Sequence, residues 1–275
     1  MTKKILSKTG LYSISLVFLA IFGFPFILVL IMSFKSMREY MGGNMWGIPQ
    51  EIYFGNFQRV FAADFNIYFR NSIIVSLVTV VTVLIIASLA AYAFVNLKFK
   101  LSKPLFTLFL VGMMIPVHTT LVPIFQLTRN LGLMDSLPGL IGPYISFGLP
   151  VAIFLLSSFF RDIPKSITES ARIDGASHFR IHWGIIMPLS TPAIATVAIH
   201  RFLISWNEFI YALTLIRSPM NRTLPLGIRQ FYDMEAVNIP AIFTAVLIGS
   251  LPVMLFYFIA QERVINGLAA GAVKG

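Results

Sequence analysis

Long apolar runs separated by short polar segments make up most of this chain. Six runs each contain roughly 20 or more mostly apolar residues, the length that an α-helix needs to cross a bilayer. They lack the alternation of apolar and polar positions that marks transmembrane β-strands. The pattern therefore predicts an all-α integral membrane protein, a single domain of six transmembrane helices. The six runs are residues 11–33, 70–95, 104–127, 138–160, 190–215 and 241–261.

Proline and glycine residues interrupt several of these runs. Gly112 and Pro116 lie in the third run, and Gly249 and Pro252 lie in the sixth. Such helix breakers are tolerated inside membranes where neighbouring helices satisfy the backbone groups that they free. We therefore expect bends in these helices, either around an internal pathway or as a result of packing.

The composition agrees with a membrane protein. Hydrophobic residues make up 57% of the 275 residues and charged residues only 12%, whereas soluble domains carry roughly 25% charged residues. The chain contains no cysteine, which excludes disulfides and metal sites with thiolate ligands.

The net charge of +10 would fit nucleic-acid binding, but the positions of the cations indicate membrane topology instead. With a cytoplasmic N-terminus, twelve Lys and Arg residues would lie in inner segments and seven in outer segments. Short cytoplasmic loops of membrane proteins are enriched in Lys and Arg. We therefore predict that both termini are cytoplasmic, that the basic residues attract membrane lipid, and that no nucleic acid is a partner.

The predicted inner segment 161–189 is longer than a simple connection requires. Residues 166–169 (Ser-Ile-Thr-Glu) have the spacing of a capping box, which predicts the start of a short helix. Gly175 is well placed to end that helix, Ser177 to cap a second one, and Pro188 to stop the second one. The pattern predicts an elbow of two short helices, and it fits a partner-binding surface and a solvated loop equally well.

This segment resembles the EAA loop of ATP-binding-cassette (ABC) importer permeases. The family pattern is Glu-Ala-Ala, three residues, Gly, nine residues, Ile, one residue, Leu-Pro. The chain has Glu169-Ser170-Ala171, Gly175, Ile185 and Met187-Pro188 at this spacing, and it departs from the pattern only at Ser170 and Met187. The resemblance implies that the loop docks onto a cytoplasmic ATPase subunit. The implied coupling residues are Glu169, Ser170, Ala171, Asp174, Gly175, Ala176 and Pro188.

Other segments resemble the carbohydrate-importer permeases, and among them the smaller, second permease subunit of maltose-type importers. The resemblance implies the type I ABC importer permease fold in the bacterial cytoplasmic (inner) membrane, and a sugar substrate such as an oligosaccharide. It also implies a companion permease subunit that completes a heterodimer, two cytoplasmic ATPase subunits and an extracytoplasmic sugar-binding protein. The segments are 123–125, 131–136, 206–209, 223–227 and the tail 267–275, which in the family reaches toward the ATPase dimer interface.

The chain has no Gly-x-x-x-x-Gly-Lys-Ser/Thr loop, the motif that cradles nucleotide phosphates. We therefore expect no cofactor in this chain and no enzyme activity of its own, with ATP and Mg bound by the partner ATPase subunits. The alternative function is a secondary transporter or channel that works without an ATPase. Such proteins usually show repeats and paired intramembrane charges, and neither is convincing here. An intramembrane enzyme would need a counterpart to His118, which is not evident.

Trp206, Asn207 and Glu208 are the candidates for the substrate pathway. Ionisable groups inside a membrane span are functional candidates because their exposure to lipid is costly. Trp206 would stack on a sugar ring, and Asn207 or Glu208 would form hydrogen bonds to its hydroxyl groups. For Glu208 we favour the alternative, a buried tie to a neighbouring helix or to the companion permease. Arg201 lies seven residues earlier, about 10 Å along a helix, too far to pair with Glu208 directly.

The predicted outer segment 216–240 resembles the loop that reaches into the sugar-binding protein in maltose-type importers. The resemblance implies that Asn221, Arg222 and Tyr232 contact the binding protein, and a solvated connector is the alternative. His178 and His182 are four residues apart and would lie on one helix face, but no third ligand is in reach by sequence. No metal site is therefore predicted.

Overall fold

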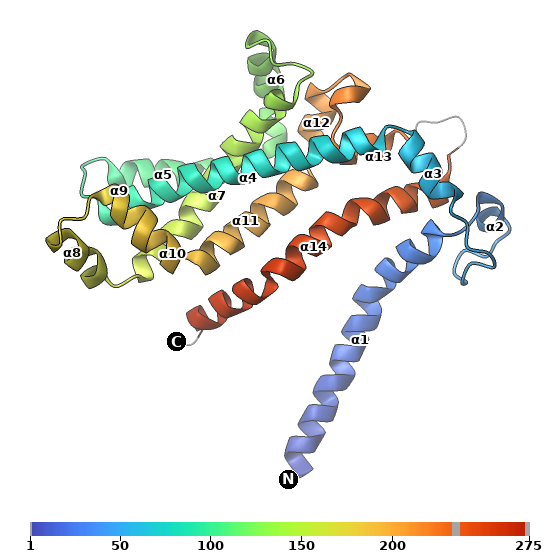
Figure 1. Cartoon of the computed structure of the whole chain (residues 1–275), viewed down its shortest axis with the longest axis horizontal. Coiled ribbons are helices and arrows are strands. Elements are labelled where there is room, and N and C mark those ends of the chain that lie inside the picture. The colour runs from blue at the N-terminus through green and yellow to red at the C-terminus, as the bar shows by residue number, and fades with distance from the viewer. Residues whose placement is uncertain (1, 233–236, 273–275) are drawn as a thin grey trace. The chain divides into compact units, whose positions relative to one another are not determined.

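In the computed structural model, the described residues, 2–232 and 237–272, form an arrangement of helices (Figure 1). Side chains are described for residues 10–232 and 237–259. No β-strand occurs among the described residues, so the all-α prediction is confirmed. Contacts divide the chain into two compact units, Met1–Asn66 with Gly227–Leu251, and Ile67–Leu226 with Pro252–Gly275.

Four of the six apolar runs form single helices that are long and apolar enough to cross a membrane. Each begins and ends within a few residues of the predicted run, except that two extend further toward the chain ends. The four helices are α1 (Thr2–Ser33), α4 (Phe65–Asn96), α7 (Leu137–Asp162) and α14 (Ile239–Ala272).

The third run is broken into two helical pieces that meet at 97°. The first piece is α5 (Ser102–Gly112), and the second joins a 3₁₀ turn, η1 (Val117–Thr120), to α6 (Leu121–Asn130). Pro116 lies at the break with an extended backbone, ψ 132°. It has no N–H to continue the helix that precedes it. The bend expected from Gly112 and Pro116 is therefore present, and the two pieces together are long and apolar enough for one span.

The fifth run is also broken. It contains α11 (Thr191–Trp206) and α12 (Ile210–Leu215), which are separated at residues 207–209. The helical segment His178–Leu189 precedes α11 and meets it at 80°. The predicted run 190–215 is therefore not one continuous helix, and the reason differs from that in the third run. After the break, the Glu208 carboxylate accepts hydrogen bonds from backbone N–H groups at the start of α12.

The remaining elements are short helices in the polar segments. In the first unit these are α2 and α3; in the second they are α8, α9, a π-helical turn η2, α10 and η3; α13 lies across the division at Gly227. They are α2 (Met37–Met41), α3 (Gly55–Ala62), α8 (Lys165–Ile173), α9 (His178–Ile181), η2 (His182–Ile186), α10 (Met187–Leu189), η3 (Pro219–Asn221) and α13 (Leu224–Arg229).

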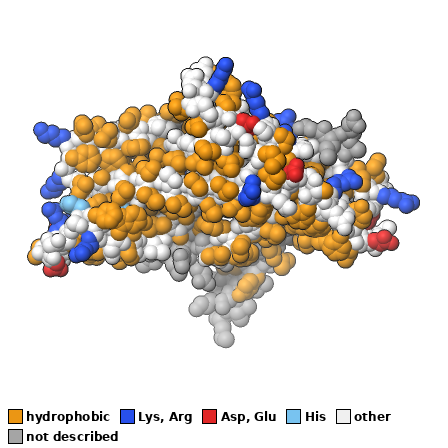
Figure 2. All heavy atoms as spheres, turned by 45° about the horizontal axis from the view of Figure 1, so that its top comes forward, with side chains coloured by type: hydrophobic (Ala, Val, Ile, Leu, Met, Phe, Trp, Pro, Cys, Tyr) orange, Lys and Arg blue, Asp and Glu red, His pale blue; other side chains and the backbone are white. Residues whose placement is uncertain are grey.

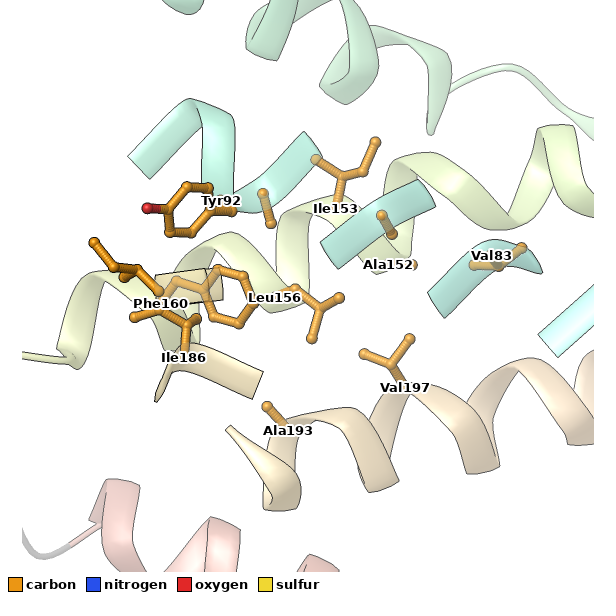
Figure 3. Close-up of a cluster of buried hydrophobic side chains, with 12 residues drawn as sticks. Val83, Tyr92, Ala152, Ile153, Leu156, Phe160, Ile186, Ala193 and Val197 are labelled. Carbon is orange, nitrogen blue, oxygen red and sulfur yellow. The ribbon is translucent and has the colours of Figure 1, made fainter. Parts of the chain in front are cut away.

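The main core of the second unit lies where α4, α7 and α11 pack together (Figure 3). Val83 comes from α4, Leu156 and Phe160 from α7, and Val197 from α11, and all are almost fully buried. Small residues lie where these helices approach one another. Helices in lipid gain little from the hydrophobic effect, so close approach at small residues supplies the packing energy. The small residues of the cluster are Ala87, Ala91, Ala152 and Ala193.

The first unit is stabilised around the end of α1. The Asn56 side-chain amide donates to the backbone oxygens of Ser33 (3.0 Å) and Lys35 (2.7 Å). The Thr244 hydroxyl lies within hydrogen-bond distance of the same Ser33 oxygen (3.1 Å) and of the Pro240 oxygen (2.9 Å). The buried Lys35 ammonium donates to the backbone oxygen of Asn44. The carbonyl groups left free where α1 ends are therefore paired within this unit.

Large apolar side chains also lie on the outside. Tyr12 and Leu19 on α1 are 72% and 71% exposed. Figure 2 shows hydrophobic side chains over most of the face in view. A soluble protein rarely exposes so large an apolar surface, so lipid or partner subunits must cover it.

Candidate functional site

The elbow, defined as residues 165–189, begins with α8. Pro164 is the N-cap residue with an extended backbone (ψ 127°), and it makes no side-chain capping bond. Ser166 therefore lies inside the helix at its second position, where its hydroxyl cannot cap the first turn. The capping-box prediction is wrong, because the helix begins at the residue that follows the proline, one position before Ser166.

The turn of the elbow is a Schellman motif. The Ala176 N–H donates to the Ala171 oxygen (2.9 Å), and the Gly175 N–H donates to the Arg172 oxygen (3.0 Å). Gly175 has φ +81°, a conformation that residues with a Cβ adopt only with strain. The prediction that Gly175 ends the first helix is confirmed, and the turn geometry depends on backbone bonds alone.

The second half of the elbow starts at Ser177, whose hydroxyl accepts from the Arg180 N–H (3.3 Å) as predicted. The chain then remains helical through α9, η2 and α10 as far as Leu189. Pro188 does not stop it, and that prediction is wrong. Pro188 occupies the second position of the last helical turn, where a missing N–H is tolerated. The direction changes after Leu189, at Ser190, where α11 leaves at 80°.

The elbow presents apolar side chains outward. Ile173 is 86% exposed and Phe179 is 69% exposed. Ala171 and Ala176 face the opposite way and pack against the core of α4, α7 and α11. The structure therefore brings the predicted coupling residues together on one short segment. Two of them lie inward, and the exposed ones are Glu169, Ser170, Asp174, Gly175 and Pro188.

Glu208 joins α12 to α7. Its carboxylate accepts hydrogen bonds from the N–H groups of Tyr211 (2.8 Å) and Ala212 (3.2 Å) and from the hydroxyl of Tyr144 on α7. A carboxylate at the start of a helix also interacts favourably with the helix dipole. The favoured alternative for Glu208, a tie to a neighbouring helix, is confirmed.

Trp206 and Asn207 close α11. Trp206 is 3% exposed, stacked on Phe202 with ring centroids 5.5 Å apart and edge-on to Phe69 at 5.6 Å. A ring enclosed in this way has no accessible face for a sugar, so the stacking prediction does not fit this structure. Asn207 is exposed, and its amide donates to the Leu203 oxygen (2.9 Å) at the end of α11.

Arg201, the basic residue that the sequence places in the fifth run, is buried among α4, α7 and α11. It is 3% exposed, and its guanidinium donates to the Tyr144 backbone oxygen (3.2 Å). Gly148 makes room for it, because a Cβ there would lie 2.8 Å from Arg201 Nε. Arg201 and Glu208 line the same small cavity of about 60 Å³, with the Ser205 side chain. Arg201 Nε and Ser205 Oγ are buried and lack a hydrogen-bond partner among the described atoms.

A second polar region, the Asp135 cluster, consists of residues 131–136 and 216–222. The Asp135 carboxylate accepts from the N–H groups of Arg217 and Ser218 (both 2.9 Å) and from the Ser218 hydroxyl. The side chain of Asn221 donates to the Asp135 backbone oxygen. Burial raises the pKa of the Asp135 carboxyl, but these hydrogen bonds outweigh it and lower the pKa below its ordinary value of 3.8.

The other side of this loop is held by α4. The Asn71 amide donates to the backbone oxygens of Met220 (2.9 Å) and Arg222 (3.0 Å). Of the residues predicted to contact a binding protein, Asn221 and Arg222 therefore lie together in a fixed loop, whereas Tyr232 belongs to the first unit. Beside the loop, Phe125, Met134 and two arginines line an open recess of about 530 Å³. The arginines are Arg129 and Arg217.

Comparison with known proteins identifies the family. Residues 83–269 match the model of the binding-protein-dependent transport system inner membrane component. The chain belongs to this family. This permease is therefore a multi-pass integral membrane protein, and its relatives include several sugar-transport permeases.

The permease is similar to named transport proteins along most of its length. It is 45% identical over 251 residues to the ABC transporter permease protein ORF2 of Caldicellulosiruptor sp., covering 91% of each chain. It is 34% identical to the trehalose transport system permease protein SugB of Mycobacterium tuberculosis, covering 91% of this chain and 92% of that one. It is 33% identical to the trehalose/maltose permease MalG of Thermococcus litoralis, covering 92% and 91%. The resemblance to carbohydrate importer permeases is confirmed.

A solved structure shows the same fold. A chain of a bacterial ABC transporter that imports the acidic polysaccharide alginate matches the permease with a TM-score of 0.81 at 23% identity. The match covers 95% of this permease and 97% of that chain. The predicted ABC importer permease fold is therefore confirmed at the level of the chain's architecture.

Several residues that organise the permease could not be identified from sequence patterns. Tyr144 holds both Glu208 and the Arg201 guanidinium, and Asn71 and Asp135 hold the loop from both sides. No local pattern distinguishes Tyr144 from other span residues. Among the residues whose side chains are described, no three or more His, Asp or Glu side chains lie close enough together to hold a metal ion.

Proposed function

We propose that this permease is the transmembrane subunit of an ABC importer that moves a sugar into the cytoplasm, driven by ATP hydrolysis on separate ATPase subunits. The observation that carries the proposal is the elbow. Ile173 is 86% exposed at the end of a helix whose turn is fixed by backbone hydrogen bonds at Gly175. An apolar side chain on a rigid polar segment is suited to a groove on a partner.

The proposed topology has six spans, with the two bent helical pairs counted as one span each. The N-terminus, the C-terminus and the elbow lie in the cytoplasm, and the Asp135 cluster lies on the outer side of the bacterial inner membrane. The distribution of Lys and Arg supports this orientation. The predicted tail contact with the ATPase dimer falls on residues 267–275; the side chains of these residues and all of 273–275 are outside the described part.

Coupling would run from the elbow into the span that follows it. The ATPase subunits bind ATP and Mg, and their closure displaces the exposed face around Ile173. A helix capped at Gly175 and Ser177 moves as a unit, whereas an uncapped loop would absorb the displacement. The rigid continuation from α9 to Leu189 passes this motion to α11 at the 80° bend.

The proposed assembly contains a companion permease that completes a heterodimer, two ATPase subunits and an extracytoplasmic sugar-binding protein. The trehalose and trehalose/maltose permeases among the relatives support a sugar substrate, and an oligosaccharide is the class that fits them. We place the binding-protein contact on the loop with Asn221 and Arg222 and on the neighbouring Arg217, with Tyr232 as a further candidate. Of the pathway candidates, exposed Asn207 is the one that we retain for direct sugar contact.

The test is substitution of Gly175 in the complete transporter reconstituted in liposomes. Gly175→Val places a β-branched residue at φ +81° with no other atom within 4 Å of its Cβ, so strain in the turn is the only local effect. We expect sugar uptake to be lost while the protein still inserts and assembles. Gly175→Asn is the matched control, because asparagine tolerates this conformation and should retain most of the uptake. Normal uptake from Gly175→Val would contradict the proposal.

A further inference from the structure

Two pairs of polar side chains join the elbow to α4. The Tyr92 hydroxyl lies 3.0 Å from His178 Nδ1, and the Ser88 hydroxyl lies 3.3 Å from His182 Nε2. Ser88 and Tyr92 are one helical turn apart on α4, and His178 and His182 are one turn apart on the elbow. The pairing order shows that the two segments run antiparallel at this contact. We call these four residues the elbow–α4 contact.

The chemistry of the Ser88 pair fixes the direction of its hydrogen bond. The Ser88 hydroxyl donates its single proton to the Ile85 backbone oxygen at 3.0 Å. It can therefore act only as the acceptor toward His182, which must carry its proton on Nε2. His182 Nδ1 then presents a lone pair, consistent with the absence of a hydrogen-bond partner for that buried atom among the described residues.

Three of the four residues of the contact are buried, whereas His178 is exposed, and aromatic rings surround His182. His182 is 1% exposed and Ser88 is 1% exposed, and Tyr92 is 5% exposed. The His182 ring lies 5.2 Å from the Tyr92 ring and 6.4 Å from the Phe160 ring at the end of α7. His182 also begins the π-helical turn η2, a geometry found often at functional positions. The elbow is thus attached to α4 and α7 as well as to α11.

The contact faces away from the exposed apolar side chains of the elbow. Phe179 is 69% exposed beside His178, while Ile181 next to His182 is completely buried. A force applied to the exposed face would turn the elbow about Ser190 if nothing held its other side. Apolar packing alone permits sliding, whereas directional hydrogen bonds at two successive turns oppose both sliding and rotation.

We propose that Tyr92 and Ser88 are positioning residues that fasten the elbow to α4, so that movement of the elbow displaces α4 together with α11. The inference rests on the proposed function, because it assumes that an ATPase moves the elbow. It adds a second path for that movement, into the helix whose other end holds the loop with Asn221 and Arg222 through Asn71. His178 and His182 supply the elbow's side of these two hydrogen bonds.

The test is the number of sugar molecules transported per ATP hydrolysed by the complete transporter in liposomes. Tyr92→Phe keeps the ring contacts and removes only the hydroxyl. Loss of one such hydrogen bond corresponds to roughly fivefold in an equilibrium constant, so we expect the transport ratio to fall about fivefold while ATP hydrolysis continues. Ser88→Ala should have a similar effect, and Ser88→Thr, which retains the hydroxyl, should restore the ratio. Tyr257→Phe is the matched control, at a tyrosine that is 54% exposed on α14.

Three outcomes would overturn the inference: an unchanged ratio in both Tyr92→Phe and Ser88→Ala, failure of Ser88→Thr to restore it, or a loss of assembled transporter with the ratio preserved. Gly175→Val in the same preparation separates this inference from the proposed function. If Gly175→Val abolishes uptake and Tyr92→Phe transports normally, only the elbow–α4 contact is refuted. If Gly175→Val also transports normally, the elbow is not the coupling element at all.

Discussion

The elbow and the Asp135 cluster are both polar breaks between apolar helices, yet they are stabilised in opposite ways. The turn of the elbow is closed by backbone bonds, from Ala176 to Ala171 and from Gly175 to Arg172. The loop of the Asp135 cluster is held by side chains, the carboxylate of Asp135 and the amide of Asn71. The two regions therefore differ in whether their side chains remain free to contact a partner. Because backbone hydrogen bonds close the turn of the elbow, side chains such as Ile173 can contact a partner. In the Asp135 cluster, the polar side chains are engaged in hydrogen bonds within the loop.

This contrast predicts different consequences of substitution in the two regions. Changes on the exposed face of the elbow should impair transport without changing stability. Changes in the Asp135 cluster should lower stability first. α7 connects the two regions in the chain, since it begins directly after Ser136 and ends at Asp162, shortly before the elbow.

The largest effect is expected for Ile173→Glu. This side chain is 86% exposed, so a charge there costs the folded chain little, but it would prevent an apolar contact with the ATPase. We expect uptake to fall at least about tenfold, equivalent to roughly 1.4 kcal/mol of lost interaction, with an unchanged melting temperature in detergent. Ile48→Glu, at a 79% exposed isoleucine outside the elbow, is the control and should transport normally. A fall in melting temperature for Ile173→Glu would break the proposed contrast.

Gly148→Ala tests the helix between the two regions. The added Cβ would lie 2.8 Å from Arg201 Nε and 3.0 Å from Val83 Cγ2, so the buried guanidinium must shift. Overpacking of this kind costs about 1–3 kcal/mol, measurable by denaturant unfolding in detergent. Gly142→Ala on the same helix meets no atom within 4 Å and should be neutral or slightly stabilising. Equal behaviour of the two variants would show that Arg201 is not confined as described.

Asp135→Asn should destabilise the cluster by about 1–2 kcal/mol at neutral pH, a value kept small because the side chain is partly solvent-exposed. The lowered pKa of Asp135 means that its stabilising contribution is present above pH 3.8 and is lost as the pH falls through the lower folded-state pKa. Thermal unfolding followed from neutral to acid pH should therefore show this dependence in the wild type and lose it in the variant. Asp64→Asn is the control, at an exposed aspartate with a similar positive φ of 57°. If Asp135→Asn changes the pH dependence of unfolding no more than Asp64→Asn does, the Asp135 carboxylate does not stabilise the cluster.

The smallest effect is expected for Ser177→Ala, which removes the cap at the Arg180 N–H. Loss of an N-cap costs about 1 kcal/mol, and hydrogen exchange at residues 178–181 should accelerate by up to about fivefold. Ser177→Asn preserves a capping oxygen and should exchange at the original rate. Unchanged exchange in Ser177→Ala would mean that the second half of the elbow depends on its contacts with α4 rather than on its cap.

Local chemistry explains what the sequence could predict. The apolar runs, the turn at Gly175 and the cap at Ser177 depend on residues close together in the chain, and all three are present in the structure. The break at residues 207–209 involves a distant residue. The Glu208 carboxylate accepts hydrogen bonds from N–H groups of α12 and also from the hydroxyl of Tyr144, which lies 64 residues earlier on α7. Trp206 is a similar case, since a pattern of three polar or aromatic residues gives no indication that Phe69 and Phe202 enclose its ring.

The position of Tyr144 also has a consequence for how the chain is built. Its hydroxyl and its backbone oxygen serve Glu208 and Arg201, and it precedes both of them in the chain. A charged side chain entering lipid alone costs about 2.5–3.5 kcal/mol on insertion scales. Because synthesis starts at the N-terminus, Tyr144 is made before Arg201 and Glu208. If the spans insert in the order of synthesis, the partner of both charges is in place before they enter the bilayer.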